Sequence, residues 1–231
     1  MTITLITGGN KGLGYEAARR LIELGHTVYI GARDEQRGNS AAEQLGARFV
    51  QLDVSDDASV AAAAAEVGRR EGHVDVLINN AGVTDPLLPP ADVTASAMHD
   101  VYDVNVFGIV RVTHAFLPML RAAPAPVIVN VSSGLGSFGV VTNPDRFESG
   151  FATVVYGSSK AAVGMLTVQY AKALPDIRIN VVDPGYTATD INGNSGHQTV
   201  TEGTDAIVRL ATIGPDGPTG TFSDRHGPLP W

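Results

Sequence analysis

A tyrosine and a lysine stand four positions apart in the segment Tyr156-Gly-Ser-Ser-Lys160. On a helix, residues i and i+4 lie on one face, so the two side chains would be neighbours. An ammonium beside a phenol favours the phenolate and lowers a pKa that is ordinarily about 10, so that the phenol exchanges a proton near neutral pH. The chain has only 3 lysines and 6 tyrosines, so we expect this spacing roughly 0.1 times by chance. The alternative is an ordinary pair of neighbours on a helix.

A glycine-rich segment, Thr7-Gly-Gly-Asn-Lys-Gly-Leu-Gly14, follows the first apolar run. Glycines at positions 8, 12 and 14 would let the chain turn tightly and bring backbone N–H groups against a pyrophosphate at the start of a helix. No Gly-Lys-Ser/Thr follows, which excludes a P-loop. The segment indicates a dinucleotide site, and the alternative is a glycine turn without a ligand.

The second apolar run ends in Gly31-Ala-Arg-Asp34. A carboxylate near this point would bind the ribose hydroxyls of NAD, whereas an arginine would bind the 2′-phosphate of NADP. Asp34 is better placed to cap the next helix. We therefore expect Arg33, with Asn10 and Lys11, to bind a 2′-phosphate through charge-assisted hydrogen bonds, which favours NADPH. The alternative is that Arg33 is a solvated surface charge.

Short apolar runs alternate with longer amphipathic stretches along the chain. The predicted strands are Thr2–Thr7, Thr27–Gly31, Arg48–Leu52, Val74–Ile78, Val127–Val131 and Ile177–Val182, and the predicted helices are Tyr15–Leu24, Ser40–Leu45, Ala58–Arg70, Met98–Arg121, Tyr156–Leu174 and Thr201–Ala211. Strands that are apolar throughout are typical of a parallel sheet covered on both faces. The order predicts an α/β fold, a doubly wound parallel sheet in three α/β/α layers, in a single domain over residues 1–231. In such sheets, ligands bind at the carboxyl ends of strands where the winding direction switches.

Composition excludes several classes of function. The chain has 231 residues, a net charge of −8 and no cysteine, which excludes disulfides and thiolate metal sites. The acidic balance, with no basic run longer than Arg69-Arg70, argues against nucleic acid and anionic membranes as partners. No apolar stretch reaches the ~18 residues of a membrane span, and the first residues leave no room for a signal peptide, so we expect a cytoplasmic protein. The 6 histidines lack metal-site spacing, and we expect no metal.

Several motifs occur together in one order that resembles the short-chain dehydrogenase/reductase family. They are the glycine turn, Asn79-Asn-Ala-Gly82, Asn105, Val129-Asn-Val-Ser-Ser133, the Tyr156–Lys160 pair and Pro184-Gly-Tyr-Thr-Ala-Thr189. The resemblance covers essentially the whole chain and implies a Rossmann-like fold. Within the family, Thr7-Gly-Gly-Asn-Lys-Gly12, Ala32-Arg-Asp34 and the chain end at Trp231 are most similar to NADPH-dependent carbonyl reductases.

The resemblance implies a role for each matching residue. Tyr156 would be the catalytic acid/base, Lys160 would lower its pKa, Ser133 would bind the substrate carbonyl oxygen, and Asn105 would hold a water that links Lys160 to solvent. The implied cofactor-binding residues are Gly8, Asn10, Lys11, Gly12, Leu13, Gly14, Arg33, Asp53, Val54, Asn80, Ala81, Gly82, Tyr156, Lys160, Pro184, Gly185, Thr187 and Thr189.

Within the cofactor-binding set, different residues would contact different parts of the dinucleotide. The glycines of the first turn would contact the pyrophosphate, Asp53 and Val54 the adenine, and Asn80 the adenosine ribose. Pro184, Gly185 and either Thr187 or Thr189 would face the nicotinamide. Ser132 competes with Ser133, although its alternative role is a backbone hydrogen bond at a strand end.

The reaction implied is hydride transfer from NADPH to a carbonyl carbon, with Tyr156 protonating the developing alkoxide. An NAD-dependent alcohol dehydrogenase or a sugar-nucleotide epimerase is a second interpretation, but epimerases need a larger carboxyl-terminal region than the roughly 45 residues after Gly185. A cofactor-sensing regulator without catalysis is a third; such proteins typically lose the Tyr or the Lys. No G-x-S-x-G elbow supports a hydrolase.

Two connections are long, Thr84–Ala97 and Gly134–Val155. The second is an insertion relative to the family, and its aromatic residues Phe138, Phe147 and Phe151 indicate an apolar ketone, aldehyde or quinone as substrate, unless they pack the insertion onto the core. Residues 188–200 predict a short substrate lid, made mobile by Gly193 and Gly196.

Many family members associate through helices that correspond to Met98–Arg121 and Tyr156–Leu174, yet some carbonyl reductases with an insertion are monomers, so monomer and homo-oligomer both stay open.

Overall fold

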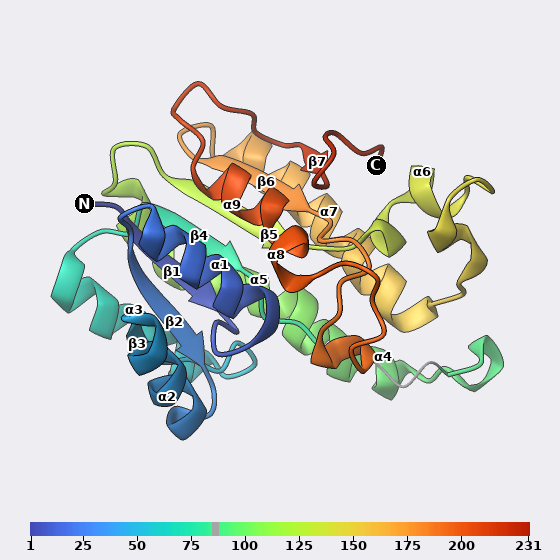
Figure 1. Ribbon diagram of the computed structural model, residues 1–231, viewed down its shortest axis with the longest axis horizontal. Helices are drawn as coiled ribbons and strands as arrows, with labels where there is room; N and C mark the ends of the chain where they lie inside the picture. Colours follow the sequence, from blue (N-terminus) through green and yellow to red (C-terminus); the bar gives the residue numbers. More distant parts are fainter. Residues whose placement is uncertain (85–87) are drawn as a thin grey trace.

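The computed structural model describes residues 1–84 and 88–231. In this part of the chain, seven parallel strands form one sheet in the order β3-β2-β1-β4-β5-β6-β7. They are β1 Ile3–Thr7, β2 Thr27–Ala32, β3 Arg48–Gln51, β4 Val76–Asn79, β5 Val127–Val131, β6 Arg178–Val182 and β7 Phe222–Ser223. Helices cover both faces of this sheet (Figure 1), which confirms the predicted doubly wound α/β/α fold.

The helices divide between the two faces according to which apolar side chains they bury. They are α1 Gly12–Glu23, α2 Glu35–Leu45, α3 Asp57–Glu71, α4 Ala95–Tyr102, α5 Gly108–Arg121, α6 Phe138–Val141, α7 Val154–Ala173, α8 Val200–Gly203 and α9 Asp205–Ala211. Apolar residues of α1, α2 and α9 share one core cluster with Ile6 and Ile30, and those of α3, α5 and α7 share the other with Leu5 and Ile128. Successive strand residues such as Leu5 and Ile6 therefore point to opposite faces, and both faces are buried.

The winding direction of the sheet reverses at β1. Ile6 of β1 pairs with Ile30 of β2 on one side and with Ile78 of β4 on the other. Chain connections that run in opposite directions from this point leave a crevice at the carboxyl ends of the strands, where nucleotides bind in such sheets. The glycine turn and the segment after Asn79 both begin at this edge.

The helix predicted over Met98–Arg121 is interrupted in the structure. A five-residue π-helix, η2 Asp103–Phe107, separates α4 from α5, and the Gly108 N–H donates to the Asp103 carbonyl five residues back. Apolar spacing cannot show such a bulge, because one extra residue in a turn leaves the periodicity on each side intact. Single-turn π-bulges occur often at functional sites, and this one contains Asn105.

Three further differences concern short elements. Strand β7 was not predicted because two residues are too short to show a pattern. The insertion contains η3 Gly134–Gly136, α6 and η4 Phe147–Gly150. Residues 85–87 of the predicted connection Thr84–Ala97 lie outside the described residues. The described part of this connection contains η1 Pro90–Asp92 and the start of α4. No described helix is long and apolar enough for a membrane span.

Candidate active site

Helix α7 brings Tyr156 and Lys160 together at the carboxyl edge of the sheet. Lys160 is only 4% exposed, and its Nζ donates to the Val131 carbonyl at the end of β5 over 3.0 Å. The same Nζ lies 5.5 Å from the centroid of the Tyr156 ring. The ammonium is thus held between a strand end and the phenol, as expected for neighbours on one helix face.

Burial shifts the pKa values of both members of this pair. Burial raises the pKa of Tyr156, the negative charge of Asp183 raises it further, and a hydrogen bond from the Ser133 hydroxyl lowers it in part. Burial lowers the pKa of Lys160 to about 8, although Asp183 opposes this effect. The pKa of Tyr156 is raised because burying a phenolate is costly, and the predicted lowering by Lys160 stays a prediction.

The two serines after β5 have different surroundings. The Ser133 hydroxyl hydrogen-bonds to Tyr156 and accepts from the Leu135 N–H over 3.2 Å. The Ser132 hydroxyl is buried and donates to the Lys160 carbonyl over 2.9 Å. Ser133 therefore lies beside the phenol, whereas Ser132 attaches α7 to the end of β5.

Asn105 joins the segment after β4 to helix α7. Its Oδ1 accepts from the Val83 N–H over 2.8 Å, and its Nδ2 donates to the Val83 carbonyl over 2.9 Å and to Ser159 Oγ over 3.1 Å. A Cβ on Gly82 would lie 3.3 Å from Asn105 Oδ1 and 3.5 Å from Lys160 Nζ. Asn105 thus lies close to Lys160, and its part in a proton relay stays a prediction.

The glycine turn after β1 is supported by the side chain of Asn80. Its Nδ2 donates to the carbonyls of Thr7 and Gly8 over 2.9 and 3.1 Å. Gly8 has a φ of +65°, which favours glycine, and a Cβ on Gly14 would lie 2.5 Å from Asn80 Nδ2. Asn80 was expected at the adenosine ribose; in the structure its amide holds the turn in place. The backbone N–H groups of Asn80 and Ala81 donate to the Thr7 hydroxyl, over 3.0 Å each.

The start of helix α1 is suited to bind a phosphate. Its N-cap, Lys11, makes no side-chain cap hydrogen bond, and the first turn contains no acidic residue. In contrast, Asp34 and Asp56 cap α2 and α3 with their carboxylates. The first N–H groups of α1, from Gly12 to Gly14 and including Leu13, therefore lack a side-chain acceptor and point to where the cofactor pyrophosphate is expected.

A hollow beside this helix start contains an arginine that was not predicted. It has a volume of about 490 Å³ and is lined by Asn10, Lys11, Tyr15, Gln36, Arg37, Ser40, Ala41 and Gln44. Asp34 accepts from the Arg37 N–H over 2.9 Å, which confirms Asp34 as the helix cap. Arg37 follows Arg33 by four positions across that cap, and this spacing of two arginines is the sequence signal that could have identified it.

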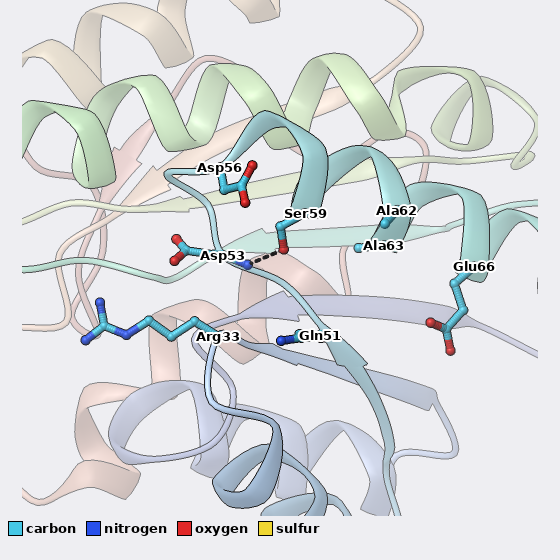
Figure 2. Close-up of a pocket in the computed structure, with 8 residues that line it drawn as sticks. All are labelled: Arg33, Gln51, Asp53, Asp56, Ser59, Ala62, Ala63 and Glu66. Atoms are coloured by element: carbon cyan, nitrogen blue, oxygen red, sulfur yellow. Dashed lines mark hydrogen bonds between the residues drawn. The ribbon is translucent and has the colours of Figure 1, made fainter.

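A second hollow, of about 430 Å³, lies at the ends of β2 and β3 and is lined by Arg33, Gln51, Asp53, Asp56, Ser59, Ala62, Ala63 and Glu66. Figure 2 shows the Arg33 and Asp53 side chains extending to the same side. Burial raises the pKa of Asp53, but hydrogen bonds from Ser55 and the charges of Arg33 and Arg111 lower it overall. Arg33 thus has an anionic neighbour. Val54 is 7% exposed, and its side chain packs against Gly108 of α5.

The turn after β6 carries the residues expected at the nicotinamide. Thr187 is buried, its hydroxyl donates to the Pro184 carbonyl over 2.9 Å, and its N–H donates to the Gly185 carbonyl over 2.9 Å. Thr189 caps η5 Asp190–Asn192 instead. Of the two threonines left open by the sequence, Thr187 is therefore the one built into the turn.

The segment 188–200 is attached to this turn and to the glycine turn. A Cβ on Gly196 would lie 2.3 Å from the Thr187 carbonyl carbon, so Gly196 is needed for close packing, and the mobility of the segment stays a prediction. Lys11 Nζ donates to Asp190 over 2.8 Å, between two exposed side chains. The segment therefore lies next to the first turn, and Lys11 already has an anionic partner there.

The close contact between η3 and α7 gives a test of how the pair is positioned. A Cβ on Gly136 would lie 2.5 Å from the Lys160 carbonyl carbon and 2.7 Å from the Ala161 nitrogen. We expect Gly136→Ala to lower the free energy of unfolding by about 1–3 kcal/mol, because backbone must move to admit the methyl group. Thermal unfolding measures this as a fall of about 2–4 °C in Tm per kcal/mol. In the control Gly150→Ala nothing lies within 4 Å of the added Cβ, and an equal fall in both variants would contradict the packing argument.

Comparison with known proteins agrees with this geometry. A family model described as short chain dehydrogenase matches residues 2–199. The chain is 36% identical to a short-chain dehydrogenase of Penicillium roqueforti, over 92% of this chain and 89% of that protein. It is 31% identical to (-)-isopiperitenone reductase of Mentha piperita, over 97% of this chain and 96% of that protein.

The fold also has solved counterparts. The crystal structure of NADPH-bound carbonyl reductase from chicken fatty liver matches with a TM-score of 0.87 and 28% identity, over 100% of both chains. No group of three or more histidines and carboxylates in the described residues could hold a metal ion. The family resemblance seen in the motifs is thus confirmed: the chain belongs to the short-chain dehydrogenase family of oxidoreductases, which bind a nicotinamide cofactor.

Proposed function

We propose that this protein reduces a carbonyl group of a small apolar molecule to an alcohol with NADPH as the cofactor. The observation that carries the proposal is the cluster of Ser133, Tyr156 and Lys160, in which two hydroxyls are hydrogen-bonded to each other beside a buried ammonium. Two hydroxyl donors that converge on one point fit a carbonyl oxygen that becomes an alkoxide.

Each residue of the cluster would have a distinct task. A nicotinamide cofactor, when bound, supplies the hydride. The Ser133 hydroxyl would donate to the substrate oxygen, and the Tyr156 hydroxyl would donate its proton to that oxygen as negative charge develops. Lys160, fixed by the Val131 carbonyl, would stabilise the phenolate that remains. Loss of one such donor commonly costs about 3 kcal/mol of transition-state stabilisation.

The preference for NADPH rests on the cations near the start of α1. Asn10, Lys11 and Arg37 line one hollow and Arg33 the other, all at the end of the sheet where the glycine turn lies. Arginine forks match the geometry of a phosphate, so Arg33 and Arg37 would bind the 2′-phosphate that NADH lacks.

The experiment that tests this function measures the consumption of NADPH and of NADH by the purified protein against aldehydes, ketones and quinones. We expect turnover with at least one apolar carbonyl and a higher kcat/KM with NADPH. Binding of NADPH without turnover of any carbonyl would favour the cofactor-sensing regulator instead.

An aromatic row that begins in the insertion after Ser133 supports an apolar substrate. It consists of Phe151, Phe147, Tyr186 and His197, whose successive ring centroids are 4.8, 5.8 and 5.9 Å apart. The row joins the insertion to the segment 188–200, and Tyr186 directly follows the turn at Gly185. Phe147 is 60% exposed, Phe151 46% and Tyr186 38%. Exposed aromatic side chains in contact with one another are typical of a binding surface for apolar groups.

We expect Phe147→Ala to raise KM about tenfold for a polycyclic aromatic ketone or quinone, because an apolar contact worth about 1.5 kcal/mol is lost. KM for a short aliphatic aldehyde is expected to stay the same, since such a molecule does not reach the row. Steady-state kinetics with both substrates measures the difference. Phe138→Ala is the matched control, because Phe138 lies on the same insertion and is 72% exposed but does not belong to the aromatic row. An equal change of KM in the two variants would mean that the aromatic row does not contact the substrate.

A further inference from the structure

A buried carboxylate, Asp183, lies at the end of β6 between two turns. The side chain is 4% exposed. Its Oδ1 accepts from the Gly185 N–H over 2.9 Å, and its carboxylate also accepts from the Gly134 N–H. A Cβ on Gly134 would lie 2.9 Å from Asp183 Oδ2. One carboxylate therefore joins the turn that follows Ser133 to the turn that carries Pro184 and Gly185.

Asp183 also acts electrostatically on the reaction site. Its negative charge raises the pKa of both Tyr156 and Lys160. The charge of Asp183 thus stabilises Lys160 as a cation and keeps the Tyr156 phenol protonated. Both effects favour the protonated forms that a carbonyl reduction needs.

Two further charged groups that act on Asp183 are acidic. They are Glu148 of η4, which is itself paired with Arg146 over 3.3 Å, and Asp224, which follows β7. Burial raises the pKa of Asp183, the N–H groups of Gly185 and Gly134 lower it, and the charges of Glu148 and Asp224 raise it again. A neutral side chain could accept hydrogen bonds from two N–H groups at a lower desolvation cost. A carboxylate at this position therefore indicates a use for its charge.

We propose that Asp183 is a positioning residue of the reaction site, which fixes the turns at Gly134 and Gly185 to each other and supplies the negative charge that faces Tyr156 and Lys160. This inference rests on the proposed function. It assigns to Asp183 the alignment of the Ser133 hydroxyl with Tyr156, because Gly134 is the next residue in the chain. It also assigns to Asp183 the pH range over which the pair stays protonated.

Asp183→Asn tests both parts through the pH profile of carbonyl reduction. Reduction needs the protonated phenol and the ammonium, so its rate falls as pH rises through their pKa values. Removal of the negative charge lowers both values, and we expect the alkaline limb of kcat to move to lower pH by about one unit. We also expect kcat at the optimum to fall about tenfold or more, with little change in KM for NADPH, because the donors are displaced. A wild-type alkaline limb in this variant would overturn the inference.

Two further variants separate charge from structure. Asp183→Glu keeps the charge but changes its reach, so we expect a lower kcat with the wild-type alkaline limb; a wild-type kcat would contradict the positioning role. It also decides the question if Asp183→Asn does not fold. Glu148→Gln is the matched control, because Glu148 faces Asp183 but is not among the described groups that shift the pKa of Tyr156 or Lys160. The alkaline limb of kcat in Glu148→Gln is expected to stay at the wild-type pH. A shift equal to that of Asp183→Asn would mean that any nearby negative charge has the same effect, and would contradict a specific role of Asp183.

A measurement without turnover distinguishes failure of this inference from failure of the proposed function. A carboxyl whose pKa is raised by folding adds stability below its unfolded pKa and loses it as pH rises through the folded pKa. We therefore expect Tm of the wild type to fall relative to Tm of Asp183→Asn as pH rises above the unfolded pKa of about 4. A Tm difference that does not change with pH would contradict the electrostatic role of Asp183 even if no carbonyl is reduced. A wild type without turnover would overturn only the proposed function.

Discussion

Tyr156→Phe is expected to lower kcat for carbonyl reduction by about 10³-fold, while the affinity for NADPH changes little. The variant keeps the ring that lies beside Lys160 and removes the hydroxyl that hydrogen-bonds to Ser133. A positioned acid contributes about 10²–10⁴-fold to a proton-transfer step. Burial raises the pKa of Tyr156, so the phenol holds its proton at neutral pH and acts as the acid.

The measurement is NADPH oxidation with an accepted carbonyl, together with a fluorescence titration of NADPH binding. Tyr170→Phe on the same helix is the matched control, because Tyr170 packs against the hydrophobic core far along α7 from the site. We expect this control to keep the wild-type rate. A Tyr156→Phe enzyme within about tenfold of the wild type would exclude Tyr156 as the acid and with it the proposed mechanism.

The double variant Arg33→Ala/Arg37→Ala is expected to raise KM for NADPH about 100-fold and to leave KM for NADH nearly unchanged. Each charge-assisted hydrogen bond to a phosphate contributes about 1.5–3 kcal/mol, and exposure of both side chains to water reduces their sum. NADH lacks the 2′-phosphate and loses nothing when the arginines are removed. The preference for NADPH would then disappear or reverse.

Steady-state kinetics with both cofactors measures the change, and the effect on NADPH is expected to weaken as salt rises, because salt screens exposed charges. Arg19→Ala is the control: Arg19 lies in α1, where it pairs with Glu16 and Glu23, and it lines neither hollow. Equal losses with NADPH and NADH in the double variant would mean that the arginines hold the fold or the pyrophosphate and do not select NADPH.

Local patterns were sufficient to predict much of this protein. Six of the seven described strands were predicted within two residues at each end, because strands buried on both faces are apolar throughout. The glycine turn could be predicted because the sequence has glycine where the turn needs it. Gly8 has a positive φ, and Gly14 lies too close to Asn80 for a side chain. The Tyr156–Lys160 pair was predicted because a helix places i and i+4 on one face.

Other features depend on contacts between distant parts of the chain. The π-helix at Asn105 lies between α4 and α5 and bonds to α7 and to the segment after β4, and nothing in the apolar spacing of the helix shows it. Gly196 was expected to provide mobility, but in the structure it packs directly on the backbone at Thr187. Arg37 was missed because its meaning depends on the hollow that the glycine turn and α2 form together.

The sequence by itself determined the fold class, the family and the chemical type of the site, since these follow from the order of apolar runs and from motifs with a fixed spacing. Only the tertiary structure decided which groups control the protons. It showed that burial raises the pKa of the Tyr156 phenol, that Ser132 bonds to the Lys160 carbonyl, and that Asp183 joins two turns beside them. The physical reason is that a pKa depends on desolvation and on charges brought close in space, and residues 133, 156 and 183 come together only when β5, β6 and α7 pack.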